Sequence, residues 1–434
     1  MPDRLAFTAV LLTALASAAR ADAPTTPPAA SAGGDESSRC AACHEKLQPG
    51  IVSDWRLSKH ARQGIGCAAC HGLTHTSEAD KELAVLPTVD TCQKCHEKQA
   101  MQFRRSKHAR AWAAVKALPT FHHLRPAAPE EVSGCAVCHR IGLKGDRDAE
   151  ALKRVGANHG QASCDACHTR HLFSKLEARQ PEACRTCHDT LQYDAWASSK
   201  HGTRHALKAS GRLPSGVAAP TCQDCHMQEG DHANRTPWGN LGLRLPHPED
   251  PGWAADRETI LVALGVLDGS GGYGPRYNAM YETGMIQLDR EAYQQQRYKL
   301  VQACKSCHAM PFIREQLDRR DRMMRQSDAL TAAALRQVVA LYTDGVLKRE
   351  GPGPFPDLVR APLGPPIEQR LAAMFFDHRA RLMATAFHMS QEWPTWVSTM
   401  EGDFVAIDQM ADDLRARPPG AKPGKKHDKK PPKR

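Results

Sequence analysis

Residues 164–188 read CDACHTRHLFSKLEARQPEACRTCH and contain two copies of the motif Cys-x-x-Cys-His. The motif occurs eight times in the 434-residue chain, and the eight copies together use all 16 cysteines. The copies are Cys40/Cys43/His44, Cys67/Cys70/His71, Cys92/Cys95/His96, Cys135/Cys138/His139, Cys164/Cys167/His168, Cys184/Cys187/His188, Cys222/Cys225/His226 and Cys304/Cys307/His308.

This motif has a specific chemical use in covalent haem attachment. Two thiols on one short turn form thioether bonds to the vinyl groups of haem, and the adjacent histidine binds the iron as its proximal ligand. A disulfide framework would suit an exported protein, but it does not require a histidine after every second cysteine. Structural zinc uses pairs of Cys-x-x-Cys and also leaves eight regularly placed histidines unexplained. The motif therefore predicts eight covalently bound haem c groups.

The spacing of the motifs predicts the kind of core. Eight haems between residues 40 and 308 are too closely spaced for each to occupy its own globular domain, so the macrocycles must stack on one another. We expect a mainly α multihaem cytochrome c with a haem-stacked core and a C-terminal long-helix region. The expected segments are a signal peptide at 1–21, a flexible leader at 22–38, an octahaem domain at 39–310, a helical region at 311–414 and a basic disordered tail at 415–434.

The two ends of the chain bear on its location and partners. Arg4 precedes an apolar run, and Ala19-Arg20-Ala21 offers a cleavage site, which predicts export to the periplasm. An uncleaved anchor is the alternative, but the run is shorter than the roughly 20 apolar residues that span a bilayer. The basic tail carries most of the formal net charge of +10 and is either a solvated extension or a docking segment for an acidic partner or membrane. Basicity confined to a tail does not favour nucleic-acid binding.

A second repeat predicts distal iron ligands. An aromatic residue stands five positions before the histidine of a Ser-Lys-His triplet in the segments 55–60, 103–108 and 196–201. On a short helix the ring would lie on a haem face while the imidazole reaches an iron, which gives a six-coordinate electron-transfer haem. The predicted distal ligands are these three histidines, His60, His108 and His201, and three others close to a haem motif, His75, His159 and His171. The candidates for any remaining place are His122, His123, His205 and His247.

Beyond the haem motifs the apolar pattern is helical. It predicts helices at 256–266, 288–303, 311–328, 329–348 and 366–414, with the last one broken at Pro394. Within the last helix an apolar stripe recurs at helical spacing, and such a stripe more often packs in a core than against a cofactor. The stripe consists of Ile367, Leu371, Met374, Phe375, Leu382 and Met383. His378 and His388 also fall in this helical region and are not counted among the ligands.

These features together resemble the octahaem hydroxylamine oxidoreductases. The resemblance rests on the eight motifs, the Ser-Lys-His segments, the quoted run from Cys164 to Cys184, and the sequence YKLVQACKSCH at 298–308. It covers residues 38–310 well and the C-terminal helices weakly. The family implies seven bis-histidine haems and one haem, at the fourth motif, whose distal side is open to a nitrogen substrate. That haem would be held by Cys135, Cys138 and His139.

The resemblance also implies roles for residues outside the motifs. The family has an Asp and a His after the seventh motif, where Asp231 and His232 stand here, and these would handle protons at the fourth haem. The alternative is that Asp231 caps a turn and His232 ligates a haem. In oxidising members a tyrosine of the C-terminal helices cross-links to the active haem. The corresponding segment here, QEWPTW at 391–396, has no tyrosine, and Tyr342 is the only tyrosine after the last motif. This resembles the reductive members.

The function that the resemblance and the export signal together imply is periplasmic reduction of nitrite or hydroxylamine to ammonia. Electrons would come from a redox partner such as a quinol-oxidising or small periplasmic cytochrome, and the family implies that the C-terminal helices assist a homotrimer. Cytochrome nitrite reductases use a motif ending in lysine at the active haem, but all eight motifs here end in histidine. The alternatives are hydroxylamine oxidation and a pure electron conduit in which all eight irons are six-coordinate.

Overall fold

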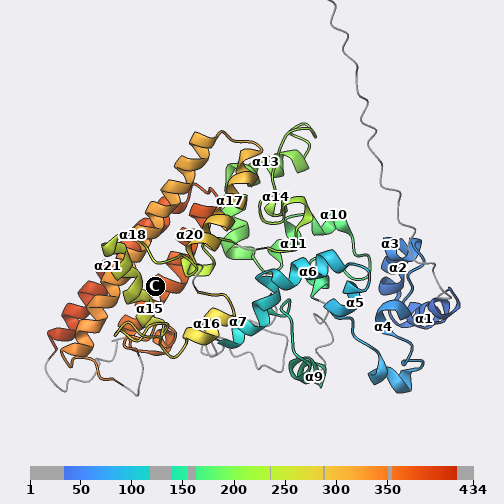
Figure 1. The fold of residues 1–434 in the computed structure, drawn as a ribbon, viewed down its shortest axis with the longest axis horizontal. Coiled ribbons are helices and arrows are strands. Elements are labelled where there is room, and N and C mark those ends of the chain that lie inside the picture. The colour runs from blue at the N-terminus through green and yellow to red at the C-terminus, as the bar shows by residue number, and fades with distance from the viewer. Residues whose placement is uncertain are drawn as a thin grey trace, which may run out of the picture.

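A computed structural model describes residues 34–117, 138–154, 163–234, 236–286, 289–349 and 354–417. These residues form helices joined by loops, with two isolated β-bridges and no β-strand, which confirms the mainly α fold (Figure 1). None of the helices in this part of the chain is both long and apolar enough to cross a membrane.

The segment that carries the first seven motifs is built from short helices (Figure 1). Its α-helices are α1 (Gly34–Leu47), α2 (Pro49–Leu57), α3 (Lys59–Arg62), α4 (Ala68–His71), α5 (Val89–Gln93), α6 (Glu97–Arg105), α7 (Ala111–Ala117), α9 (Asp146–Arg154), α10 (Lys175–Ala178), α11 (Glu182–Arg185), α12 (Asp194–Ala197), α13 (Lys200–Ala209) and α14 (Cys222–His226). The 3₁₀ and π turns between them are η1 (Glu78–Leu83), η2 (His108–Arg110), η4 (Cys164–Ala166), η5 (Asp189–Tyr193), η6 (Gln228–Gly230) and η7 (Asn240–Gly242). α1 begins five residues before the expected start of the octahaem domain.

The rest of the described chain contributes seven further α-helices, which include the three longest ones and lie toward one end of the molecule (Figure 1). They are α15 (Pro251–Ala263), α16 (Tyr277–Glu282), α17 (Arg290–Lys305), α18 (Met310–Thr343), α19 (Pro366–Ala373), α20 (Arg379–Phe387) and α21 (Trp393–Arg415), with the turns η8 (Ala361–Leu363) and η9 (Met374–His378). α18 packs against both α15 and α21.

Two helix predictions in this region are wrong in detail. The helices expected at 311–328 and 329–348 are one continuous helix, α18. Ser327 and Asp328, weak helix formers at the expected break, are buried; the Ser327 hydroxyl donates to the Met324 carbonyl at 2.9 Å, and the Asp328 carboxylate accepts from two arginines. The break expected at Pro394 lies slightly earlier, between the end of α20 at Phe387 and the start of α21 at Trp393, and Pro394 itself stands in the first turn of α21, where its missing N–H costs nothing.

A side-chain core fills the long-helix end of the molecule. The predicted stripe from Ile367 to Met383 is buried, with exposures of 0–6%. The largest apolar cluster joins α15, α18, α19, α20 and α21, so the core extends back to α15, before the eighth motif. The haem-motif segment has one small cluster, around Val89, Phe103 and Ile141. Apolar side chains therefore build the core of the C-terminal helices. The haem-motif segment has too few buried apolar side chains to form a comparable core and must pack around something else.

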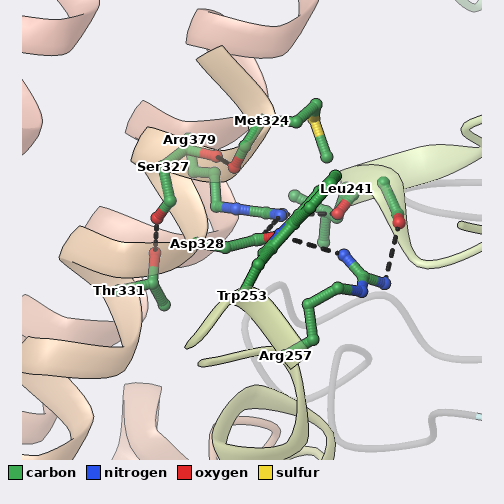
Figure 2. Close-up of polar contacts among 9 residues, drawn as sticks. Leu241, Trp253, Arg257, Met324, Ser327, Asp328, Thr331 and Arg379 are labelled. Atoms are coloured by element: carbon green, nitrogen blue, oxygen red, sulfur yellow. Dashed lines mark hydrogen bonds and ion pairs between the residues drawn. The ribbon is translucent and has the colours of Figure 1, made fainter. Parts of the chain in front are cut away.

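A buried charge cluster ties this core to the loop at 239–245 (Figure 2). Asp328 accepts from Arg379 at 2.5 Å, from Arg257 at 3.1 Å and from the Trp253 indole at 2.7 Å. The arginines also donate to the carbonyls of Leu241 and Gly242, which sit in a tight turn with positive φ. A side chain at Gly242 would collide with Met324. The cluster thus fixes the loop against α18 and α20.

Candidate haem sites and active site

One continuous cavity of about 3780 Å³ runs through the haem-motif segment. A pocket for a single small-molecule ligand measures about 300–1,000 Å³, so this cavity has room for several large ligands. All eight motif histidines line it, together with at least one cysteine of each motif. Cys135, the first thiol of the fourth motif, lies outside the described residues.

One predicted attachment residue departs from this arrangement. Cys43, the second thiol of the first motif, is exposed and does not line the cavity, whereas Cys40 and His44 of the same motif do. The whole first motif lies within helix α1. Cys40 and His44 stand four residues apart and share one helix face, but Cys43 is turned about 100° away from His44. The seventh motif is also helical throughout and both of its cysteines line the cavity, so helicity does not exclude a thioether at Cys43, and attachment of the first haem through this thiol stays a prediction.

The polar atoms along this cavity fit a bound cofactor. Buried polar groups in folded proteins normally have hydrogen-bond partners. Here buried side-chain atoms without a partner in the described structure occur on several residues that line the cavity. They belong to Ser163, Asp165, His171, Gln223, His232, Trp238, Gln296 and Arg320. Together with the thiols and imidazoles, these atoms suit covalently attached haem c.

Seven of the motif histidines face a second histidine across this cavity. Two metal–imidazole bonds of about 2 Å each, with the iron between them, place two ring centroids about 6 Å apart. The observed centroid separations are 6.1–6.3 Å. The pairs are His44–His75, His71–His171, His96–His60, His168–His232, His188–His108, His226–His388 and His308–His201. Each pair has the spacing of a bis-histidine haem.

The Ser-Lys-His repeat has a structural cause. Each serine lies at the junction of two helices, and each of the three residues is 1% exposed. The Ser58 hydroxyl accepts from the N–H of Ala61 at 3.1 Å, and Ser106 and Ser199 accept from the corresponding N–H groups at 3.2 Å. The histidine therefore stands in the first turn of a new helix, which fixes its direction. The three aromatic residues of the repeat also line the cavity.

Several of these imidazoles are held by their other ring nitrogen. The His75 Nδ1 lies 2.9 Å from Asp80, and the His71 and His388 Nδ1 atoms lie 3.0 and 2.8 Å from backbone carbonyls. A carbonyl or carboxylate can only accept, so Nδ1 carries the proton and Nε2 is left for a metal. Burial, and next the facing histidine, lowers the pKa of His226 and of His108 to about 4. Both rings are thus neutral, the form that binds iron.

Contacts between cysteines give the order of the motifs in space. Cys40 acts electrostatically on Cys67, Cys70 on Cys92, and Cys225 on Cys304, so motifs one, two and three are neighbours and so are seven and eight. The Cys92 and Cys164 thiols lie close enough to interact, as do those of Cys184 and Cys222 and those of Cys167 and Cys184. The order is therefore one, two, three, five, six, seven, eight. The fourth motif joins at the sixth, because the Cys138 Sγ lies 3.9 Å from the Cys187 carbonyl oxygen.

In the described part of the chain the fourth motif lacks the second histidine that the other seven have. Among the described residues, no second imidazole faces His139 at the bis-histidine spacing. The His139 Nδ1–H donates to the Ala111 carbonyl at 2.8 Å, so its Nε2 is available. The backbone of Gly142 passes so close to α7 that an added Cβ would lie 2.1 Å from the Trp112 nitrogen. Only glycine permits this approach, which holds the motif against α7.

A half-buried lysine reinforces the same contact. The Lys144 ammonium donates to the Arg140 and Gly142 carbonyls and lies 5.3 Å from the centre of the Trp112 ring. The Trp112 indole in turn donates to Asp148 at 2.9 Å. Burial lowers the pKa of Lys144 to about 8. The loop that follows His139 is thus fixed by groups of its own and by α7.

The structure places Asp231 and His232 away from the roles that the family resemblance implies. His232 faces His168 of the fifth motif at 6.3 Å, and its backbone N–H donates to Gln102 at 3.2 Å. The Asp231 carboxylate accepts from the Ala233 N–H at 2.9 Å, which closes a turn. This arrangement is the stated alternative, in which Asp231 caps a turn and His232 ligates a haem.

The structure places the other predicted distal ligands and Tyr342 as follows. His60, His75, His108, His171 and His201 each face a motif histidine, whereas His159, His122 and His123 lie outside the described residues. His205 packs beside Trp196 instead. The Tyr342 hydroxyl donates to Glu368 within the C-terminal core and does not line the cavity.

His388 is the ligand candidate that sequence reasoning missed. It lies just after α20 and faces His226 at 6.2 Å. It has neither a Ser-Lys-His triplet nor a neighbouring haem motif, so no local signal marked it. Only the packing of α20 against the haem-motif segment reveals it.

Comparisons with known proteins agree with this geometry. A family model described as "Seven times multi-haem cytochrome CxxCH" matches residues 63–237, and one described as "Cytochrome c554 and c-prime" matches residues 14–72. The chain is 26% identical over 387 residues to a probable nitrite reductase-hydroxylamine oxidoreductase fusion protein of Kuenenia stuttgartiensis. That match covers 75% of this chain and 41% of the relative, so the chain spans less than half the length of that protein.

Two solved structures share the fold. One is a reducing hydroxylamine-oxidoreductase-like protein complex of Kuenenia stuttgartiensis, with a TM-score of 0.62, 21% identity and coverage of 88% of this chain and 85% of that one. The other is a hypothetical multihaem protein, with a TM-score of 0.60, 18% identity and coverage of 88% and 97%. At these identities the likeness establishes the fold.

Proposed function

We propose that this chain, which is similar to hydroxylamine-oxidoreductase-like multihaem cytochromes c, is a periplasmic octahaem oxidoreductase that reduces nitrite or hydroxylamine to ammonia at the fourth haem. When bound, the haems supply one-electron carriers and, at the fourth motif, an iron position open to a nitrogen ligand. Electrons would come from a quinol-oxidising or small periplasmic cytochrome.

One observation carries this proposal. Seven proximal histidines have a second imidazole at the bis-histidine spacing, and His139 has none among the described residues. An iron with two imidazoles is saturated and suits electron transfer, whereas an iron with one can bind a substrate. This contrast supports the fourth motif as the place for chemistry, with His122, His123 and His159 outside the described residues.

The chain's own residues prepare this site. Ala111 fixes the tautomer and direction of His139 through the Nδ1 hydrogen bond. The same short segment carries His108, which faces His188 of the sixth motif. Since the fourth and sixth motifs also touch through Cys138 and the Cys187 carbonyl, the site is held directly against the rest of the series.

The residues favour reduction over oxidation. The segment 391–396 contains no tyrosine, although Gln391 and Trp393 line the cavity. Tyr342 is engaged with Glu368 inside the C-terminal core. Within the described residues after the last motif, no tyrosine hydroxyl is thus placed to modify a haem. The similar Kuenenia complex is itself described as reducing.

The test is an anaerobic assay of purified holoprotein with nitrite and with hydroxylamine, each with a reduced electron donor and with an oxidised acceptor. We expect ammonia from the reduced donor. The matched control is His205→Ala, which alters a histidine with no facing motif histidine and should turn over like the parent. Oxidation without reduction would reverse the assigned direction. If a protein with eight attached haems neither reduces nor oxidises these substrates, the proposed enzymatic function is wrong and the chain is an electron conduit.

A further inference from the structure

Arg320 is a buried cation that faces the haem cavity. It lies on α18, its side chain is 4% exposed, and it lines the cavity. Its Nη1 donates to the Gln316 carbonyl in the same helix, whereas its Nε has no hydrogen-bond partner in the described structure. A guanidinium has five donors, so most of its hydrogen-bonding capacity is left for another group.

No carboxylate of the described residues forms an ion pair with this guanidinium. The neighbouring Asp321 is held by Arg297 through two bonds of 3.0 and 2.6 Å. Two other buried arginines, Arg257 and Arg379, share the buried Asp328 (Figure 2). Burial lowers the pKa of Arg320 to about 10, which reflects the cost of an uncompensated buried charge. An anion beside Arg320 would compensate this charge.

The position of Arg320 identifies the anion. Arg320 is close enough to act electrostatically on Cys304 of the eighth motif and on His388, which faces His226 of the seventh. It thus stands at the junction of the seventh and eighth haem sites. A haem c attached at either motif brings two propionate carboxylates into the same cavity. A guanidinium binds a carboxylate through two parallel N–H···O bonds.

We propose that Arg320 binds a propionate of the haem at the seventh or eighth motif and acts as a positioning residue that anchors α18 to the haem series. The proposal rests on haem attachment at these two motifs and does not depend on the substrate. A cation beside a propionate offsets a negative charge near the iron and so favours the ferrous state. Removing it lowers the reduction potential of that haem and lets the propionate titrate near neutral pH.

The experiment compares Arg320→Gln and Arg320→Lys with the parent holoprotein by spectroelectrochemical titration at several pH values. In Arg320→Gln we expect one or two haems to move to lower potential and to become more pH-dependent. Arg320→Lys keeps the charge and should move them less. The control is Arg322→Gln, an exposed arginine two positions along the same helix, which should leave every potential unchanged.

An Arg320→Gln titration that superimposes on the parent would overturn the proposal. If that variant does not accumulate with a full set of haems, a cryo-EM map of the parent holoprotein shows whether Arg320 contacts a propionate. A propionate oxygen within hydrogen-bond distance of Arg320 supports the proposal, and a guanidinium that contacts only water or protein refutes it. Intact mass and the ammonia assay on the parent test haem attachment and catalysis separately, so failure of either is distinguishable.

Discussion

The imidazole of His388 faces that of His226 with ring centroids 6.2 Å apart, although one follows a C-terminal helix and the other belongs to the seventh haem motif. The His388 Nδ1–H donates to the Ala384 carbonyl at 2.8 Å, which directs Nε2 toward the cavity. The C-terminal helices therefore take part in the haem sites.

Replacing His388 by alanine should remove one axial ligand. We expect one additional high-spin haem in the ferric absorption and magnetic circular dichroism spectra, with the number of attached haems unchanged. His378→Ala is the control, because His378 lies 2.5 Å from Asp403 and does not line the cavity. A fully low-spin spectrum at the seventh haem of His388→Ala would contradict the pairing.

His232→Ala separates the two roles considered for that residue. Because His232 faces His168 at 6.3 Å, the variant should gain a high-spin signal from the fifth haem. A proton donor at the fourth haem would instead slow turnover and leave the low-spin signals unchanged. Parallel spectra and rates of the variant and the parent measure the difference.

Asp80→Asn tests the hydrogen bond that holds His75. The Ser77 N–H, followed by the Thr76 hydroxyl and other donors, holds the pKa of Asp80 well below its usual range. A depressed carboxyl pKa stabilises the fold above the unfolded value of about 3.9 and loses this contribution as the pH falls. The variant should therefore be less stable than the parent at neutral pH, and the difference should shrink below about pH 4.

The same variant should shift the first haem to a higher reduction potential, because His75 loses the carboxylate partner that makes it a stronger donor to iron. Redox titration measures this shift, and chemical denaturation at several pH values measures the stability. The exposed neighbour Glu78→Gln serves as the control. Equal potentials and equal pH profiles for Asp80→Asn and the parent would count against the role of Asp80.

Asp328→Asn should destabilise the C-terminal core. Burial alone would raise the pKa of Asp328, but Arg379 and Arg257 outweigh it and the pKa is lowered. Neutralising this carboxylate leaves two buried guanidinium groups uncompensated, which typically costs about 3–5 kcal/mol. Denaturant unfolding should show this loss, whereas Asp318→Asn, exposed on the same helix, should change stability little. A loss below about 1 kcal/mol would show that the cluster is not the link between loop and helices.

The features that could be predicted from the sequence are those that depend on a few neighbouring residues. The Cys-x-x-Cys-His motif carries its own attachment chemistry, and the buried cap Ser58 and its two counterparts explain why the Ser-Lys-His repeat could be read as a ligand signal. The pairing of His226 with His388 could not be predicted, because it depends on how α20 packs. The continuity of α18 was missed for a similar reason, since the partners that hold Asp328 within a helix come from α15 and α20.

The central claim is that seven haems have two histidine ligands and the haem of the fourth motif has one. Quantitative magnetic circular dichroism of the ferric holoprotein, normalised to protein, tests it most directly. We predict seven low-spin bis-histidine haems and one high-spin haem per chain. Eight low-spin haems per chain, with no high-spin component, would contradict the account.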